Sequence, residues 1–261
     1  MIKKLDMKVA LVTGGGTGLG RCIALEFARE GADVVISSRN LANLEKVAGE
    51  IRAMGRRSLP VVTDVSVAEQ VRNMVKQTVD HFGRIDILVN NAGVLLKALI
   101  VDIPEEDWDS VMDTNLKGTF LSIQAAGKHM IRQRYGRIIN ISAIAGIRAN
   151  YPENGAYGVS KAGVILLTKS AALELGPYGI NVNCIAPGPV DTGFREISET
   201  PEQIQRWLET SKKRSIMGRV GTPQDIANLA LFLASDDSSF ICGETIVIDG
   251  GRICQGYLGG G

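Results

Sequence analysis

The segment Thr13-Gly14-Gly15-Gly16-Thr17-Gly18-Leu19-Gly20 carries the strongest indication of the fold. It follows a short apolar run, Val9–Thr13, and precedes a segment with helical spacing, Arg21–Arg29. Glycines in such a turn let the backbone approach a pyrophosphate closely, and the amino end of the following helix then binds the phosphate. A flexible loop has the same composition. Its place between the first strand and the first helix favours a dinucleotide-binding turn.

Outward from this turn, short apolar runs alternate with longer helical segments along the whole chain. The runs lack polar alternation, which is typical of strands in a parallel sheet covered on both faces. The further predicted strands are Val34–Ser37, Pro60–Thr63, Ile85–Asn90, Arg137–Ser142, Asn181–Ile185 and Thr245–Ile248. The predicted helices between them include Leu41–Met54, Val67–Phe82, Leu116–Arg132 and Ala156–Leu175. This order predicts one α/β domain over residues 1–261, a doubly wound parallel (Rossmann) sheet of about seven strands with helices on both faces.

Two segments do not fit the alternation. Residues 190–223 are polar, charged and amphipathic in parts, and a segment of that length inside a compact domain is usually functional. We therefore expect a lid over a substrate site there. Residues 252–261 end in three glycines and are predicted to form a flexible tail.

Composition excludes several classes of function. The chain has 261 residues, 45% of them hydrophobic, and a formal net charge of +1, which argues against a nucleic-acid surface and for a small partner. Its four cysteines and two histidines lack metal-binding spacing, so neither a metal site nor a disulfide framework is indicated. No signal peptide or membrane-spanning run is visible in the sequence. We expect a cytoplasmic protein.

The end of the second predicted strand distinguishes two dinucleotides. An acidic residue at this position would bind the ribose 2′-hydroxyl of NAD, but the chain reads Ser37-Ser38-Arg39-Asn40. The Arg39 guanidinium can pair with a 2′-phosphate, and Ser38 and Asn40 can add donors, so NADP is favoured over NAD. The alternative is that Arg39 is a solvated surface charge.

A tyrosine and a lysine lie one helical turn apart in Tyr157-Gly158-Val159-Ser160-Lys161. A nearby ammonium favours the phenolate, so Lys161 is expected to lower the pKa of Tyr157. A tyrosine tuned in this way can act as a general acid or base. Such pairs are common on helix surfaces, so a catalytic role for this pair depends on agreement with the other motifs of the chain.

Over about residues 8–251 the chain resembles the short-chain dehydrogenase/reductase family. The resemblance rests on the order and spacing of several motifs: the turn at Thr13–Gly20, Asp64-Val65, Asn90-Asn91-Ala92-Gly93, Asn115 in Thr-Asn-Leu-Lys-Gly, Tyr157 with Lys161, and Pro187-Gly188-Pro189-Val190-Asp191-Thr192. The family members that it is most similar to in function are 3-oxoacyl-carrier-protein reductases and sugar or polyol dehydrogenases.

The resemblance implies a role for each matching residue. Tyr157 would exchange the proton, Lys161 would tune Tyr157 and bind the nicotinamide ribose, and Asn115 would hold a water that extends the proton relay. The implied cofactor-binding residues, with those from the phosphate turn and the second strand, are Gly14, Gly16, Thr17, Gly18, Leu19, Ser38, Arg39, Asn40, Asp64, Val65, Asn91, Ala92, Gly93, Tyr157, Lys161, Pro187, Gly188, Val190 and Thr192.

One catalytic position departs from the family pattern. The family serine that polarises the substrate carbonyl corresponds to Ala143, and Ser142 stands one place earlier, fifteen residues before Tyr157 instead of the usual thirteen. Neighbouring side chains on a strand point to opposite faces, so Ser142 would point away unless the strand bulges. Three explanations are open: a bulge gives the role to Ser142, another hydroxyl takes it, or polarisation is weaker. We take Ser142 as the candidate.

The sequence thus predicts an NADP(H)-dependent ketoreductase or alcohol dehydrogenase that transfers a hydride between the nicotinamide and a carbonyl or secondary alcohol, with Tyr157 as general acid and base. The alternatives are an NAD-dependent sugar or polyol dehydrogenase and, because of Ala143, a cofactor-binding regulatory protein with little turnover. The family resemblance also implies a homotetramer with interfaces from the helices at Leu116–Arg132 and Ala156–Leu175 and from the last strand.

Overall fold

The structure is a computed structural model, and it describes residues 3–149, 152–192 and 200–254. Seven strands form one parallel sheet in the order β3-β2-β1-β4-β5-β6-β7. The strands are β1 (Val9–Thr13), β2 (Asp33–Ser38), β3 (Ser58–Val62), β4 (Ile87–Asn90), β5 (Gly136–Ile141), β6 (Ile180–Pro187) and β7 (Thr245–Ile248). The predicted doubly wound fold and its number of strands are confirmed.

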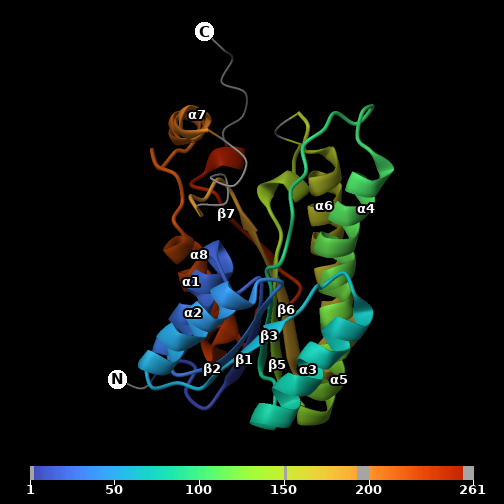
Figure 1. Cartoon of the computed structure of the whole chain (residues 1–261), viewed down its shortest axis with the longest axis vertical. Helices are drawn as coiled ribbons and strands as arrows, with labels where there is room; N and C mark the ends of the chain where they lie inside the picture. The colour runs from blue at the N-terminus through green and yellow to red at the C-terminus, as the bar shows by residue number, and fades with distance from the viewer. Residues whose placement is uncertain (1–2, 150–151, 193–199, 255–261) are drawn as a thin grey trace.

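Helices cover both faces of the sheet, as Figure 1 shows. One face carries α1 (Gly18–Arg29), α2 (Leu41–Ala53) and α8 (Pro223–Ala234), whose apolar side chains form one core with the sheet. The other face carries α3 (Ala68–Phe82), α5 (Gly118–Gln133) and α6 (Gly155–Leu175), which form the second core. The strands between them are almost completely buried, which explains their continuous Val and Ile runs.

The structure contains two further helices. The acidic turn Glu105-Glu106-Asp107 predicts the start of the first, and the sequence did not predict the second. The short helix α4 (Glu105–Met112) begins with three acidic residues, which suit the positive end of the helix dipole. The second, α7 (Pro201–Lys213), lies within the segment expected to be a lid and begins at a capping box formed by Thr200 and Gln203. Its sequence is mostly polar and charged, so it contains no apolar run from which a helix would be predicted.

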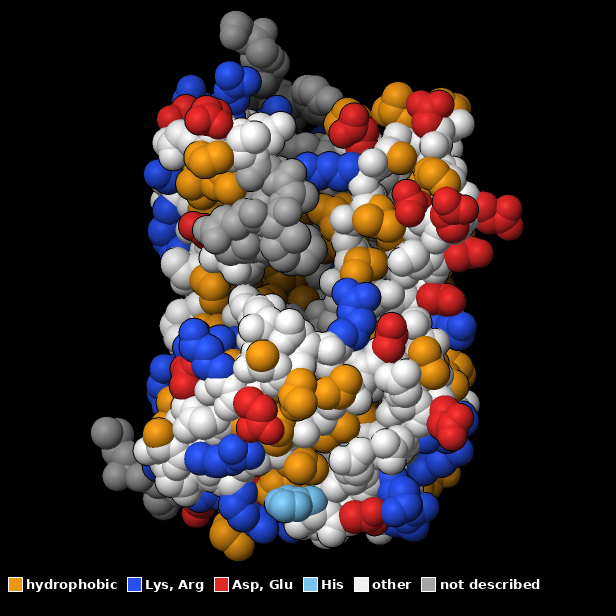
Figure 2. Space-filling view, viewed as in Figure 1, with side chains coloured by type: hydrophobic (Ala, Val, Ile, Leu, Met, Phe, Trp, Pro, Cys, Tyr) orange, Lys and Arg blue, Asp and Glu red, His pale blue; other side chains and the backbone are white. Residues whose placement is uncertain are grey.

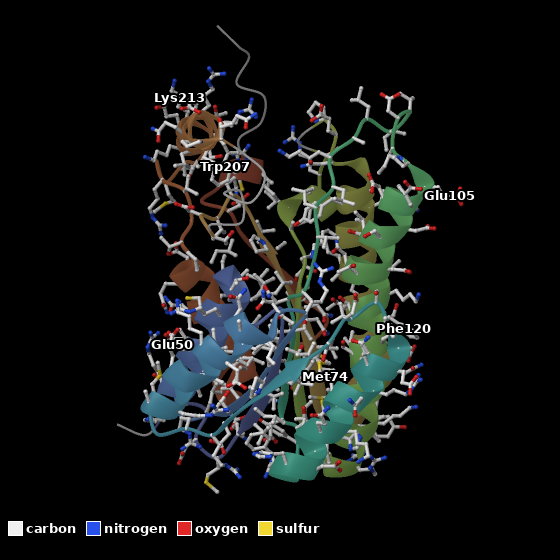
Figure 3. All side chains as sticks on the ribbon, in the orientation of Figure 1. Glu50, Met74, Glu105, Phe120, Trp207 and Lys213 are labelled. Atoms are coloured by element: carbon white, nitrogen blue, oxygen red, sulfur yellow. The ribbon has the colours of Figure 1, made fainter. Side chains whose placement is uncertain are left out.

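The two ends of the segment around α7 are hydrogen-bonded to each other. Gly221 N donates to Pro189 O at 3.0 Å, and Asp191 N donates to Gly221 O at 3.0 Å. Figure 3 shows Trp207 and Lys213 on α7, at the opposite end of the molecule from α3. Residues 193–199 of the expected lid lie outside the described residues.

The segment expected to be a tail begins with an ordered turn. Arg252–Cys254 forms a 3-10 turn, and Arg252 is buried. Residues 255–261 lie outside the described part of the chain.

The carboxyl ends of the strands meet at one edge of the sheet, where the chain changes direction between β1 and β4. Ligands of open α/β sheets bind in the crevice at such a switch point. In the space-filling view the surface is hollowed above this edge (Figure 2). Among the helices of the described residues, none has both the length and the apolar character needed to cross a membrane.

Candidate active site

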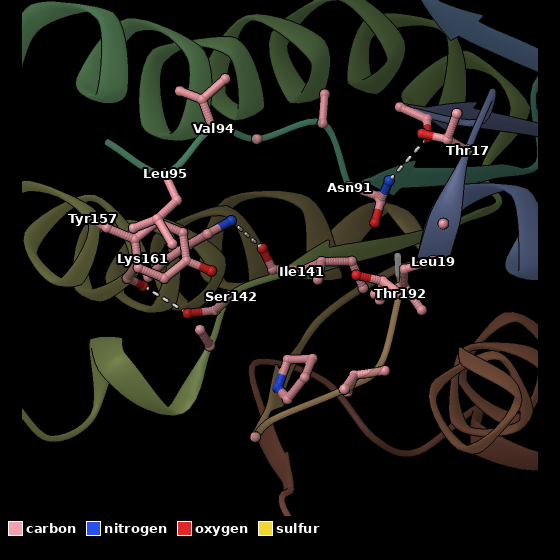
Figure 4. Close-up of a pocket in the computed structure, with 18 residues that line it drawn as sticks. Thr17, Leu19, Asn91, Val94, Leu95, Ile141, Ser142, Tyr157, Lys161 and Thr192 are labelled. Atoms are coloured by element: carbon pink, nitrogen blue, oxygen red, sulfur yellow. Dashed lines mark hydrogen bonds between the residues drawn. The ribbon is translucent and has the colours of Figure 1, made fainter. Parts of the chain in front are cut away.

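A cavity of about 530 Å³ lies at this edge and connects the phosphate turn with the amino end of α6 (Figure 4). Most of the residues predicted for the site line it: Gly14, Thr17, Gly18, Leu19, Asn91, Ala92, Gly93, Ser142, Tyr157, Lys161, Pro187, Gly188, Val190 and Thr192. Val94, Leu95, Ile141 and Ala143 line it as well. Of these four, the sequence did not indicate Val94, Leu95 or Ile141, which carry no polar group that a motif search would select.

The phosphate turn has the shape that its glycines require. Gly14 has φ +66°, and a Cβ on it would lie 2.7 Å from Asn91 Nδ2. The same Asn91 amide donates to Thr13 O at 3.0 Å and to Gly14 O at 3.3 Å. The turn is therefore held against the end of β4 by Asn91, and only a glycine fits at position 14. Thr17 is the N-cap residue of α1 in extended backbone, with no side-chain cap bond.

Tyr157 and Lys161 lie on the first turns of α6, as the spacing predicts. Lys161 Nζ is 5.6 Å from the centroid of the Tyr157 ring. The ammonium donates to Ile141 O at 2.9 Å, and the Lys161 carbonyl accepts from Ser142 Oγ at 2.8 Å (Figure 4). The carboxyl end of β5 thus holds Lys161 at both its side chain and its backbone.

The sequence predicts that Lys161 lowers the pKa of Tyr157, and the structure gives the opposite shift. Burial raises the pKa of the Tyr157 hydroxyl to about 12, and burial lowers the pKa of the Lys161 ammonium to about 8. The prediction of a lowered tyrosine pKa is wrong for this arrangement, because burial of the hydroxyl decides the shift while the ammonium is directed to Ile141 O.

Asn115 lies beside Lys161 on a turn of π-helix, Asp113–Lys117, between α4 and α5. Its side chain is completely buried: Oδ1 accepts from Val94 N at 2.8 Å, and Nδ2 donates to Val94 O at 2.9 Å and to Ser160 Oγ at 3.0 Å. A Cβ on Gly93 would lie 3.1 Å from Asn115 Oδ1 and 3.5 Å from Lys161 Nζ. The side chains of Asn115 and Lys161 therefore both approach Gly93, at the cavity wall.

The register of β5 bears on the role of Ser142. The strand pairs with β6 without interruption up to Ile141 and Ile185, and Ser142 N donates to Ile185 O at 2.8 Å. The bulge that would turn Ser142 toward a substrate is absent from this described stretch. The single hydroxyl proton of Ser142 is already donated to Lys161 O. Ala143 follows in extended backbone and lines the same cavity.

The residues predicted to hold the adenosine end lie outside the lining of this cavity. Arg39 is exposed, and Asn40 caps α2 by accepting from Asn43 N at 3.0 Å. A Cβ on Gly16 would lie 3.2 Å from Ser38 Oγ. The two hydrogen bonds from Ser66 hold the pKa of the Asp64 carboxyl below its usual value, and the Arg39 charge adds to this effect. Arg39 and Asp64 therefore share one end of the site.

Val65, another residue that the resemblance implies for cofactor binding, is buried. It packs against α5, since a Cβ on Gly118 would lie 2.8 Å from Val65 Cγ2. Within the described residues no group of three or more His, Cys, Asp or Glu side chains is placed to hold a metal ion.

Comparisons with known proteins agree with this geometry. Residues 14–252 match the protein family described as enoyl-(acyl carrier protein) reductase. The chain is 42% identical over 250 residues to a 3-oxoacyl-[acyl-carrier-protein] reductase of Thermotoga maritima, covering 96% of this chain and 99% of the relative. It is 44% identical over 250 residues to the (2S)-[(R)-hydroxy(phenyl)methyl]succinyl-CoA dehydrogenase subunit BbsD of Thauera aromatica, covering 95% and 97%.

Solved structures give the same result. A short-chain type dehydrogenase/reductase from Mycobacterium marinum superposes with a TM-score of 0.91 at 38% identity, covering 97% of this chain and 98% of the other. Three observations lead to the same family. They are the sequence matches, the order of the strands in the sheet, and the cavity that holds the phosphate turn together with Tyr157 and Lys161. The chain belongs to the short-chain dehydrogenase/reductase family and is an oxidoreductase of that family.

Proposed function

We propose that the protein is an NADP(H)-dependent ketoreductase that reduces a carbonyl on an acyl thioester, with Tyr157 as the general acid. One observation carries the proposal: a single cavity is lined both by the phosphate turn and by Tyr157 with Lys161. A dinucleotide that binds the turn with its phosphates can therefore extend its nicotinamide to the tyrosine. We expect the protein to act in the cytoplasm, as predicted from the sequence.

The residues of the cavity fit such a cofactor. Gly14 lets the turn close against Asn91 at the cavity wall, and the amino end of α1 at Gly18 faces the cavity with backbone N–H groups that have no side-chain cap. Gly188, Val190 and Thr192 would lie along the nicotinamide end, and Ser38, Arg39 and Asp64 along the adenosine end. When bound, the cofactor supplies the hydride.

The proton chemistry belongs to the protein. With a pKa of about 12, the Tyr157 hydroxyl is protonated at neutral pH and can donate its proton to the oxygen of a reduced carbonyl. Lys161 would return a proton to Tyr157, and Asn115, beside Lys161, would hold a water that continues the relay. Ser142 is the sequence candidate for polarising the carbonyl, and Ala143 is its neighbour on the cavity wall.

The substrate class follows from the relatives and the cavity wall. The two relatives named above act on an acyl-carrier-protein thioester and on a coenzyme A thioester, according to their names. The wall beside Tyr157 is apolar at Val94 and Leu95, which suits an acyl chain. A panel of 3-oxoacyl thioesters, simple ketones and polyols, assayed by NADPH oxidation or NADP reduction, tests the proposal. Tight NADPH binding without turnover of any compound would favour a regulatory protein instead.

Replacing Arg39 with Asp is expected to reverse the cofactor preference. The variant lacks the guanidinium that would bind the 2′-phosphate of NADP, and its carboxylate could accept from the ribose 2′-hydroxyl of NAD. We expect the affinity for NADPH to fall about 10- to 100-fold and that for NADH to rise, since one charge-assisted pair to a phosphate is worth about 1.5–3 kcal/mol. Fluorescence titration with both cofactors measures this, and Arg72→Asp on α3 is the matched control. Unchanged affinities would show that Arg39 does not read the phosphate.

We also propose that the protein forms a homotetramer through α5, α6 and the last strand, with a second copy of the chain covering the outer face of α6. Val159, Leu166 and Leu173 stand seven residues apart on that helix and are 48%, 66% and 81% exposed. Phe120 on α5 is exposed as well. A regular apolar row of this length on the surface of an enzyme is typical of an interface.

Replacing Leu166 with Glu is expected to break this assembly, because each copy of the chain would bury an unpaired carboxylate in the interface. Light scattering after size exclusion should give a mass near four times 28.0 kDa for the unmodified chain and a smaller mass for the variant. Leu41→Glu, at an exposed leucine on the opposite face of the sheet, is the control. A single-chain mass for the unmodified protein would contradict the proposal.

A further inference from the structure

Ser160 lies on α6 between Tyr157 and Lys161, and its hydroxyl connects two parts of the site. The residue is completely buried. Its Oγ accepts from Asn115 Nδ2 at 3.0 Å and donates to Tyr157 O at 2.8 Å. A serine hydroxyl has one proton and a carbonyl can only accept, so Ser160 donates its proton to Tyr157 O and accepts from Asn115.

These bonds continue a chain that begins at the cavity wall. Val94 lines the cavity, and its N–H and C=O are both bound by the Asn115 amide. The Asn115 amide is bound in turn to Ser160, which holds the carbonyl of Tyr157. A π-helical turn inserts one extra residue and is often found at functional sites. Here it places Asn115 against α6, so that Val94, Asn115 and the first turn of α6 are locked together.

We infer that Ser160 is a positioning residue for the Tyr157 and Lys161 pair, acting through Asn115; this rests on the function proposed above. Without the hydroxyl, one buried N–H of Asn115 loses its acceptor, and a buried donor left without a partner is costly. Relief of that cost requires the Asn115 side chain or the α6 turn to move. A displacement of about 1 Å at a reacting group can lower a rate about 100-fold.

Many buried helical serines donate to a carbonyl one turn earlier and do nothing more. Ser122 on α5 is such a residue: it is completely buried and donates to Gly118 O at 2.9 Å. Ser122→Ala therefore removes a comparable hydroxyl from a helix next to α6, and it serves as the matched control. The feature that separates Ser160 from Ser122 is the bond accepted from Asn115.

The test compares Ser160→Ala, Ser160→Thr and Ser160→Val with Ser122→Ala in the full-length protein. Ser160→Ala is expected to lower kcat about 10-fold with less than a twofold change in the KM for NADPH. Thr and Val have the same shape, and only Thr restores the hydroxyl, so Ser160→Thr should keep most of the activity that Ser160→Val loses. This pair remains informative if the Ala variant does not fold.

Hydrogen exchange in the absence of cofactor gives a second readout that does not depend on turnover. Backbone amides of residues 113–117 and 155–161 should exchange about 10-fold faster in Ser160→Ala, and at the original rate in Ser122→Ala. The inference is overturned if kcat and exchange are unchanged in Ser160→Ala, if Ser122→Ala has the same effects, or if Thr and Val behave alike. An unmodified chain that turns over no substrate would refute the proposed function, and the exchange comparison would still test Ser160.

Discussion

Phenylalanine in place of Tyr157 is expected to lower the rate of carbonyl reduction about 1000-fold while NADPH binds with nearly unchanged affinity. The substitution removes one oxygen and keeps the ring that lines the cavity. A positioned general acid contributes about 10²- to 10⁴-fold to a rate, and in this site Tyr157 is the proposed donor. The loss should appear in kcat, because the proton moves only in the chemical step.

The raised pKa of Tyr157 bears on its protonation state in the free protein. At a pKa of about 12 the hydroxyl keeps its proton at neutral pH, which is the state that a proton donor requires. Lys161, with a pKa of about 8, is charged below that pH and can return a proton to the tyrosine.

Steady-state rates with NADPH and the best substrate of the panel, together with NADPH titration, measure the effect of Tyr157→Phe. Tyr178→Phe is a suitable control, since Tyr178 is a partly exposed tyrosine on a short turn after α6. If Tyr157→Phe keeps more than a tenth of the rate, the proton comes from another group and the proposed role of Tyr157 is wrong.

Local patterns were sufficient to predict the fold and the outline of the site. The strands appear as Val and Ile runs because both faces of the sheet are covered, and the phosphate turn appears as glycines because Gly14 has no room for a side chain. Tyr157 and Lys161 come together through helical spacing alone. Each of these features leaves a local pattern in the sequence, even where its cause is a contact with a distant segment.

The features that the sequence could not predict depend on contacts between distant segments. The sign of the Tyr157 pKa shift depends on how deeply α6 packs against β5, and the position of the Lys161 ammonium depends on the Ile141 carbonyl. The π-helical turn at Asn115 brings its side chain to Val94 and Ser160, and no sequence pattern indicates either of these contacts. The helix α7 was missed because its polar sequence buries almost no apolar side chain, and its clearest signal is the capping box of Thr200 and Gln203.

A serine at position 143 is expected to raise the rate of reduction. Ala143 lines the cavity with Tyr157, in extended backbone directly after β5, and stands where the family pattern has a serine. A hydroxyl there could donate to the oxygen of the substrate carbonyl, where negative charge develops. One donor of this kind is worth about 10²- to 10³-fold, so we expect Ala143→Ser to raise kcat by about 10-fold or more. Ala145→Ser, on the adjoining turn, is the control.

Combining this change with Ser142→Ala separates the two possible roles of Ser142. If Ser142 polarises the carbonyl, Ser142→Ala should lower kcat and the added serine of Ala143→Ser should restore it in the double variant. If Ser142 instead serves to hold Lys161, as its bond to Lys161 O indicates, a new hydroxyl at position 143 cannot replace that bond, and the double variant should stay impaired relative to Ala143→Ser alone. An unchanged kcat in Ala143→Ser would mean that the substrate carbonyl already receives a hydrogen bond from another donor. A double variant with the full kcat of the unmodified protein would identify that donor as Ser142.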